Sequence, residues 1–297
     1  MAEAVVLLNA HEDVVLFREA VTFTAAQTRF STRLIEKDYF CSLALQYLAA
    51  RAPGLVFRGG TCLAKIHLGF YRLSEDLDFL VSTPLEASRA ERSKRAEELK
   101  KAIAAVDKDL SGFRVATPVT GANDSRQYNA LISYKSLMAE REEHLKIEVG
   151  FREPVLNAVV DGEARTLLLN PLNGEPVAPV FPIRVLSRDE AMAEKVRAAL
   201  SRGDVAIRDF YDVDHAVQRS GLRAEDMAIL DLVRLKLAVP GNEGVNVSES
   251  RLAALRRQLD AELRPVLRED EFAAFNLDRA FRTVAGIAAA LRESEKR

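Results

Sequence analysis

The sequence is poor in cysteine and has almost no net charge. Cys41 and Cys62 are the only cysteines among 297 residues, and neither belongs to a C-x-x-C pair or has a histidine nearby at metal-ligand spacing. This pattern argues against a structural zinc site or a disulfide framework and favours a reducing compartment. The formal net charge of −2 provides no overall basic field for binding nucleic acid, although it is compatible with a local basic groove.

Long hydrophobic runs are also lacking. No stretch reaches 18 uncharged apolar residues, and no basic segment precedes the apolar run at residues 5–8. The sequence therefore predicts no membrane span and no signal peptide, and we expect a cytoplasmic protein without a membrane partner. Hydrophobic residues make up 48% and charged residues 29%, as in ordinary globular proteins of one large or two modest domains.

The most informative stretch is a glycine turn followed by an acidic strand. An apolar run at residues 55–57 ends at Gly59 and Gly60, residues 61–70 have helical spacing, and Asp76 and Asp78 then alternate with apolar residues. Two carboxylates on one strand face lie about 7 Å apart. Beside a turn rich in N–H donors, they suit a magnesium ion carrying a nucleoside triphosphate. Either feature alone is common, but their combination in this order is much more specific.

Three later residues are candidates for the same chemistry, each with a simpler structural alternative. Glu148 lies on the polar face of an alternating strand at residues 144–151, where it could merely face solvent. Lys195 lies at the edge of the apolar face of a helix at 187–201, so its amine could simply reach water. Asp209 falls in the first turn of the next helix, where the helix dipole alone favours a carboxylate.

These motifs resemble the nucleotidyltransferase superfamily and, within it, the AbiEii/MenT toxins of AbiE-type toxin–antitoxin systems. The resemblance rests on Arg58-Gly59-Gly60-Thr61-x-Leu63-x-Lys65, on Arg72-x-Ser74-Glu75-Asp76-x-Asp78, on Glu194-Lys195 and on Arg208-Asp209-x-Tyr211-Asp212. It implies an α+β fold, with a nucleotidyltransferase-like mixed β-sheet domain at residues 1–180 that includes N-terminal helices. A mainly helical domain at 181–297 is expected to complete the active cleft.

The resemblance also implies roles for individual residues. Catalysis would involve Asp76, Asp78, Lys195 and Asp209, with Arg208 and Asp212 as weaker candidates. Nucleotide contacts would come from Gly59, Gly60, Thr61, Lys65 and Ser74. The metal, Mg²⁺ or alternatively Mn²⁺, would be held by Asp76, Asp78 and Glu148.

The implied activity is transfer of a nucleoside monophosphate from an NTP to the 3′ end of tRNA by a metal-dependent toxin. Such transfer would block aminoacylation and translation, and an antitoxin encoded nearby would neutralise it. Two alternatives stay open. One is a nucleotidyltransferase that modifies a small-molecule or protein hydroxyl, which a net charge of −2 mildly favours. The other is an NTP-binding regulator without turnover.

The remaining pattern predicts mostly helices. Helices are expected at 12–27 and 31–51, and Glu36, Lys37 and Asp38 of the second are interpreted as a solvated face. A single charged helix is expected at 85–110, with strands at 113–119 and 127–135. Residues 153–184 are interpreted as turns around a short strand at 164–169. Helices are expected from 187 onward, where arginines 251, 256, 257 and 264 could line an RNA-binding face or only aid solubility.

Overall fold

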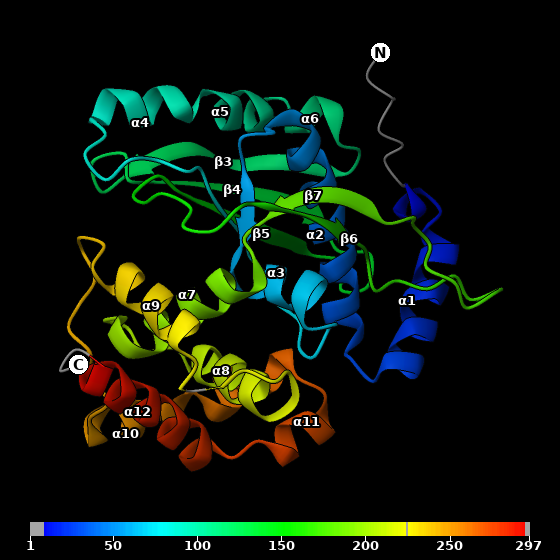
Figure 1. Cartoon of the computed structure of the whole chain (residues 1–297). Coiled ribbons are helices and arrows are strands. Elements are labelled where there is room, and N and C mark those ends of the chain that lie inside the picture. The colour runs from blue at the N-terminus through cyan, green and yellow to red at the C-terminus, as the bar shows by residue number, and fades with distance from the viewer. Residues whose placement is uncertain (1–8, 224, 295–297) are drawn as a thin grey trace. The chain divides into compact units, whose positions relative to one another are not determined.

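Figure 1 shows the computed structural model, which describes residues 9–223 and 225–294. The apolar run at residues 5–8 lies outside them. The chain forms two compact units. Unit 1 contains the chain up to Gly69, Leu73–Val155 and Val159–Leu186; unit 2 contains Phe70–Arg72, Leu156–Ala158 and the chain from Ser187 onward. Two short segments that precede Ser187 in the sequence therefore belong to the unit formed mainly by the chain from Ser187 onward.

Unit 1 is built around a mixed sheet, as the sequence predicted. Over the described residues its strand order is β3-β4-β5-β2-β1-β7-β6. The strands are β1 (Val56–Arg58), β2 (Leu77–Leu80), β3 (Phe113–Ala122), β4 (Gln127–Lys135), β5 (Glu142–Gly150), β6 (Val160–Ala164) and β7 (Phe181–Val185). The central strand β2 pairs antiparallel with β1 and parallel with β5. Because side chains alternate along a strand, Leu77 and Phe79 face the core while Asp78 lies on the opposite face.

Helices and short helical turns complete the regular structure of unit 1 over its described residues. They are η1 (Ala10–Glu12), α1 (Val14–Thr28), α2 (Thr32–Arg51), α3 (Gly59–Cys62), η2 (Leu63–His67), α4 (Arg89–Arg95), α5 (Glu97–Ala104) and α6 (Val106–Asp109). In Figure 1, α4, α5 and α6 run alongside β3 and β4, and α5 packs against both β3 and α2. The single helix expected at 85–110 is wrong, because irregular turns at Ala96 and Ala105 divide it into α4, α5 and α6.

The charged residues at the start of α2 are buried, which corrects their interpretation as a solvated face. Glu36, Lys37 and Asp38 are only 1%, 6% and 4% exposed. Glu36 accepts a hydrogen bond from the hydroxyl of Ser136 at 2.6 Å, 100 residues further along the chain. Lys37 Nζ donates to the carbonyl of His144 at 2.6 Å. These remote partners compensate the cost of burying charge, and local periodicity carries no information about them.

Asp38 pairs with Lys65, whose side chain is almost fully buried. Lys65 Nζ lies 2.5 Å from Asp38 Oδ1 and also donates to the hydroxyl of Ser42 at 2.8 Å. The second carboxylate oxygen of Asp38 accepts the backbone N–H of Leu167 at 2.7 Å. The pair therefore joins α2, η2 and the chain before β7 within the core of unit 1.

The proline-rich stretch contains a strand that the sequence analysis missed. β7 alternates buried and exposed residues, but Pro182 lies within it, and proline normally counts against a strand. The expected strand at 164–169 is also wrong: β6 ends at Ala164, and Leu169 forms only an isolated bridge with Pro176. β7 pairs parallel with β1, directly before the glycine turn.

Unit 2 is helical over its described residues. Its helices are α7 (Arg188–Ser201), α8 (Ile207–Arg219), α9 (Met227–Leu237), α10 (Glu249–Gln258), η3 (Leu259–Leu263), η4 (Arg264–Val266), α11 (Glu269–Ala274) and α12 (Leu277–Ser294). Helix α8 packs against both α7 and α12. The Ser187 hydroxyl caps α7 by accepting the N–H of Glu190. No helix in the described part of the chain is long and apolar enough to cross a membrane.

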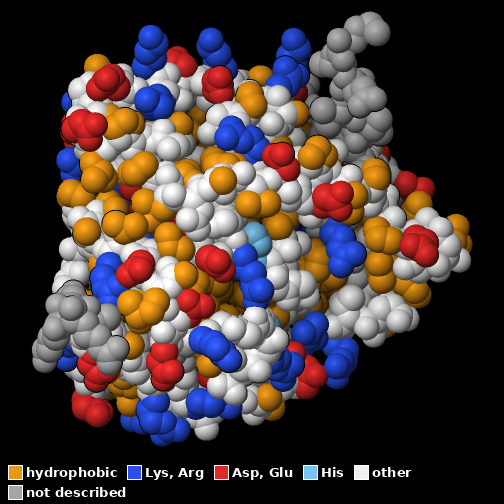
Figure 2. Space-filling view, viewed as in Figure 1, with side chains coloured by type: hydrophobic (Ala, Val, Ile, Leu, Met, Phe, Trp, Pro, Cys, Tyr) orange, Lys and Arg blue, Asp and Glu red, His pale blue; other side chains and the backbone are white. Residues whose placement is uncertain are grey.

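The arginines considered for RNA binding do not share one exposed face. Arg251 is buried, with 6% of its surface exposed. Arg256 pairs with Asp278 at 3.0 Å, and Arg264 pairs with Glu269 at 3.1 Å. On the face drawn in Figure 2, Lys and Arg side chains are interspersed with Asp and Glu. The exposed Arg256 and Arg264 therefore fit the simpler interpretation as solvated residues, whereas the buried Arg251 fits neither interpretation.

Replacing Lys65 with Met should destabilise the protein strongly. The substitution keeps the length of the side chain but leaves Asp38 as an uncompensated buried charge, which typically costs about 3–5 kcal/mol. Urea-induced unfolding at neutral pH measures the loss. Arg18→Met is the matched control, because it breaks the exposed Arg18–Glu140 pair and should cost below about 1 kcal/mol. Equal losses in the two variants would contradict a structural role of the buried pair.

Candidate functional site

The glycine turn and the acidic strand are in direct contact. β1 ends at Arg58, and Gly59 begins α3 with a positive φ of 78°. A Cβ atom added to Gly59 would lie 2.8 Å from the Cβ of Asp78, closer than real Cβ atoms approach. Position 59 therefore requires glycine for two reasons. Its backbone is left-handed, and the Asp78 side chain leaves no room for a Cβ atom.

A hydrogen bond fixes the second acidic residue to the same turn. The Thr61 hydroxyl donates to the backbone carbonyl of Asp76 at 2.6 Å. Asp76 directly precedes β2, and both Asp76 and Asp78 are half-buried. This hydrogen bond ties the acidic segment to the glycine turn and uses the hydroxyl proton of Thr61. The direct phosphate contact that the sequence suggested for Thr61 stays a prediction.

Glu148 lies beside Asp78. In the parallel pairing of β2 with β5, Asp78 is opposite Glu148, and Asn129 of β4 is opposite Glu148 on the other side. Neighbouring strands are about 4.8 Å apart, so these residues form a row across the polar face. Glu148 Oε1 accepts from Gln127 Nε2 at 2.8 Å and lies 3.1 Å from Lys146 Nζ. The sequence analysis did not select Gln127 or Lys146, although the alternation of β4 and β5 places both on this face.

The other two residues predicted to bind nucleotide lie in different surroundings. The ammonium group of Lys65 is in the core, bound to Asp38 and Ser42. Ser74 is half-buried in the irregular segment before β2. Their nucleotide contacts stay predictions.

The carboxylates fit a magnesium ion that arrives with its nucleotide. The described residues contain no group of three or more His, Cys, Asp or Glu side chains arranged to hold a metal ion. Mg²⁺ is usually bound by one or two carboxylates together with substrate phosphates and water, and an all-protein cage is unusual for it. Asp76 and Asp78 would supply such a pair of hard oxygen ligands, and Glu148 is a further carboxylate, opposite Asp78 in the pairing of β2 with β5.

Unit 2 contains a separate cluster of buried charges. Lys195 Nζ on α7 lies 2.8 Å from Asp209 Oδ1 and 3.1 Å from Asp212 Oδ2, both on α8. The Arg72 guanidinium donates to both oxygens of Asp212, at 2.5 and 2.8 Å, and the Tyr71 hydroxyl donates to Asp212 Oδ1 at 2.5 Å. The predicted residues Lys195 and Asp209 are therefore in contact, and Asp212 connects them to the segment Phe70–Arg72.

In this cluster, the opposite charges shift the pKa values more strongly than burial does. Burial alone would raise the pKa of Asp212, but Arg72 and Lys195 hold it well below its usual range. Burial would lower the pKa of Lys195, but Asp209 and Asp212 raise it above its ordinary value. Lys195 and Asp212 are therefore charged at neutral pH.

A family model matches most of the chain, including both groups of residues. Residues 44–285 match the family model described as "Nucleotidyl transferase AbiEii toxin, Type IV TA system". The match spans the glycine turn, Asp76, Asp78, Lys195 and Asp209. The chain belongs to the AbiEii family. Its family and its mixed α/β fold support nucleotidyl transfer as its activity.

A solved structure shows the same fold at low sequence identity. JHP933 from Helicobacter pylori is 15% identical, with a TM-score of 0.51, over 90% of this chain and 95% of that one. A second H. pylori protein, provisionally described as a nucleotidyltransferase, is 16% identical with a TM-score of 0.48, over 90% and 98% of the two chains. No curated protein sequence matches the chain.

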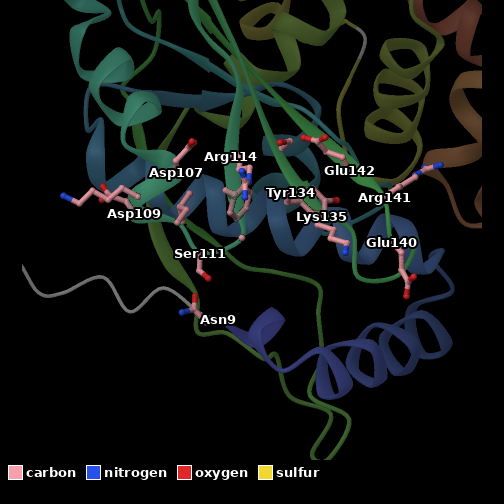
Figure 3. Close-up of a pocket in the computed structure, with 15 residues that line it drawn as sticks. Asn9, Asp107, Asp109, Ser111, Arg114, Tyr134, Lys135, Glu140, Arg141 and Glu142 are labelled. Carbon is pink, nitrogen blue, oxygen red and sulfur yellow. The ribbon is translucent and has the colours of Figure 1, made fainter.

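The large cavity of unit 1 is distinct from the candidate site of this AbiEii chain. It has a volume of 1130 Å³ and lies among α6, the start of β3 and the junction of β4 with β5 (Figure 3). None of the predicted site residues lines it. Along β5, Glu142 at the cavity is about 20 Å from Glu148, at about 3.3 Å per residue. Basic and acidic side chains line it in equal number, so the cavity presents no single charge to a ligand: Lys108, Arg114, Lys135 and Arg141 against Asp107, Asp109, Glu140 and Glu142.

Replacing Gly59 with Ala should disrupt the site more than the backbone strain alone explains. Gly69→Ala is the matched control, because Gly69 has a similar φ of 71° but nothing within 4 Å of an added Cβ. We expect Gly69→Ala to cost about 1–2 kcal/mol in unfolding free energy. Gly59→Ala should cost more and should also weaken Mn²⁺ binding in the presence of nucleotide. Chemical denaturation and calorimetric titration measure the two effects. Indistinguishable variants would argue against a steric requirement at Asp78.

Replacing Asp212 with Asn should destabilise unit 2 in a pH-dependent way. The substitution leaves Arg72 and Lys195 without their shared counter-charge, at a cost of about 3–5 kcal/mol at pH 7. Because the folded-state pKa of Asp212 is depressed, its stabilisation is complete above the unfolded value of about 3.8 and is lost as pH falls further. The difference in unfolding free energy between wild type and variant should therefore be constant from pH 7 to about pH 5 and shrink below pH 4. A difference that grew on acidification would contradict this account.

Proposed function

We propose that this chain is a toxin that transfers a nucleoside monophosphate from an NTP to the 3′ end of tRNA. The observation that carries the proposal is the contact between Gly59 and the Asp78 carboxylate, in a chain of the AbiEii family. Transfer to the 3′ end would block aminoacylation and thereby translation. Family membership also implies a cognate antitoxin.

The proposed reaction needs positioning and charge neutralisation more than covalent catalysis. The acceptor oxygen forms a bond to the α-phosphorus while the bond to the β-phosphate oxygen breaks and pyrophosphate leaves. Asp76 and Asp78 would hold Mg²⁺, which when bound neutralises charge on the triphosphate. The first N–H groups of α3 have no partner within the helix, so the turn at Gly59 and Gly60 can donate to phosphate oxygens.

The proposal includes three further residues, whose roles follow from the resemblance of the sequence motifs. Lys195 would offset negative charge on the triphosphate as a point charge. Glu148 or Asp209 would orient the acceptor hydroxyl or take its proton, which must leave as the new bond forms. Single variants of these residues should be tested in the tRNA-labelling assay described below for Asp78.

A small-molecule or protein hydroxyl remains the second candidate acceptor, for a specific reason. On the polar face around Asp78, the cations Arg58 and Lys146 are balanced by Glu148 and by the aspartates themselves. Binding of a nucleic-acid backbone usually relies on an excess of positive charge. The local charge of unit 1 therefore does not select tRNA over a smaller acceptor.

Each radiolabelled NTP should be offered separately to the purified protein with total tRNA and Mg²⁺. We expect label in tRNA from one preferred NTP, and none when the tRNA 3′ end has been oxidised with periodate. Asp78→Asn should lower incorporation by about 100-fold or more, because it removes a metal ligand worth several kcal/mol. Asp161→Asn, at an exposed carboxylate on the edge strand β6, is the matched control and should retain activity.

Three results would overturn parts of this proposal. Label in a small molecule or a protein but not in tRNA would favour the second acceptor class. Nucleotide binding without pyrophosphate release from any acceptor would favour a regulator without turnover. Full activity of Asp78→Asn would remove the assignment of the site.

A further inference from the structure

A network of side-chain amides holds Glu148 next to the acidic strand. Gln127 Nε2 donates to Glu148 Oε1 at 2.8 Å and to Asn129 Oδ1 at 2.9 Å. Gln127 and Asn129 are both half-buried on β4, two positions apart and therefore on the same face. Asn129 is opposite Glu148 in register, and Glu148 is opposite Asp78. Asp78, Glu148 and the amides of β4 thus form a row of polar side chains across three neighbouring strands.

The chemistry of the groups fixes the orientation of the Gln127 amide. An ionised carboxylate only accepts hydrogen bonds, so the group facing Glu148 must be the NH₂ of Gln127. The same NH₂ faces Asn129, which must therefore present its carbonyl oxygen. Turning the Gln127 amide around would place its carbonyl against the carboxylate. The network therefore has one favourable arrangement, and it restrains Glu148 through Oε1.

The other oxygen of Glu148 stays available. Both Gln127 and Lys146 contact Oε1, and no hydrogen-bond partner of Oε2 occurs in the described part of the chain. The Glu148 side chain is 28% exposed, so Oε2 remains open to a ligand. Lys146 is 49% exposed, and an ion pair with so exposed a partner restrains geometry weakly. Of the two partners, the half-buried Gln127 is the one that can fix the rotamer of Glu148.

We propose that Gln127 is a positioning residue that holds Glu148 so that its free oxygen is presented beside Asp78 to the metal–nucleotide complex. This inference rests on the proposed nucleotidyl transfer, because it assumes that a metal binds at Asp78. Gln127 itself touches neither metal nor substrate. It acts by restricting the carboxylate to one orientation, in the way that partners of metal ligands commonly tune metal sites.

The test uses Gln127→Leu, which keeps approximate size and removes the donor. Mn²⁺ binding is measured by calorimetry on the full-length protein with a non-hydrolysable NTP analogue and no acceptor. We expect Gln127→Leu to weaken Mn²⁺ binding about 10-fold, at the lower end of the 10–100-fold typical for partners of metal ligands. Gln27→Leu, the same change at an exposed position of α1, should leave binding unchanged.

A double-mutant cycle separates positioning from a general structural effect. If Gln127 acts through Glu148, adding Gln127→Leu to Glu148→Gln should weaken Mn²⁺ binding no further than Glu148→Gln does alone. A purely structural role would instead lower the unfolding free energy and give additive losses.

The outcomes distinguish this inference from the proposed function. Wild-type Mn²⁺ affinity in Gln127→Leu, or additive losses in the cycle, would overturn the role of Gln127 while leaving nucleotidyl transfer intact. A Gln127-dependent metal site in a protein that labels no acceptor would support the inference and overturn the proposed function. Absence of Mn²⁺–nucleotide binding in the wild type would overturn both.

Discussion

The close approach of Gly59 to the Asp78 carboxylate constrains the rest of unit 1. A side chain on Gly59 would occupy the space of Asp78, so the turn and the strand can meet only when a glycine is present. The Thr61 hydroxyl adds a second connection through the carbonyl of Asp76. Pairing of β1 with β2 and β7 then fixes the turn within the sheet. The glycine motif and the acidic motif are thus two parts of one local structure.

Unit 2 follows a different principle, in which buried charges hold helices together. Asp212 contacts Arg72, Tyr71 and Lys195, which come from two separate parts of the sequence. Burying such groups is costly, and only complete pairing makes it tolerable. Arg72 belongs to the sequence motif that contains Asp76 and Asp78, yet its partner is on α8. A motif residue can therefore be required for the fold of another part of the chain.

The sequence alone predicted the strand positions of two residues of the candidate site. Alternation predicted that Asp78 and Glu148 lie on polar strand faces, and the register of β2 with β5 places them side by side. The sheet and most helices were predicted because their apolar periodicity is local information. The family assignment is confirmed by the match to residues 44–285.

Other features depend on partners that no local pattern contains. Glu36 and Asp38 have the spacing of a solvated face, and only Ser136 and the other remote partners make their burial possible. β7 was missed because Pro182 is unfavourable in most strands, although its pairing with β1 supports the glycine turn. The ammonium group of Lys65 is likewise bound to Asp38 in the core, a contact that its motif does not reveal, and its nucleotide contact stays a prediction.

The donor set around Asp78 also bears on how the metal would bind. A protein that keeps a resident ion usually surrounds it with protein ligands, whereas Mg²⁺ in phosphoryl transfer takes much of its coordination from substrate and water. Asp76 directly before β2, Asp78 on β2 and Glu148 on the neighbouring β5 suit the second situation. In such a site the protein contributes few ligands, so the orientation of each carries more weight. If Glu148 is such a ligand, as proposed, this requirement explains why one of its oxygens is held by the Gln127 amide while the other is left open.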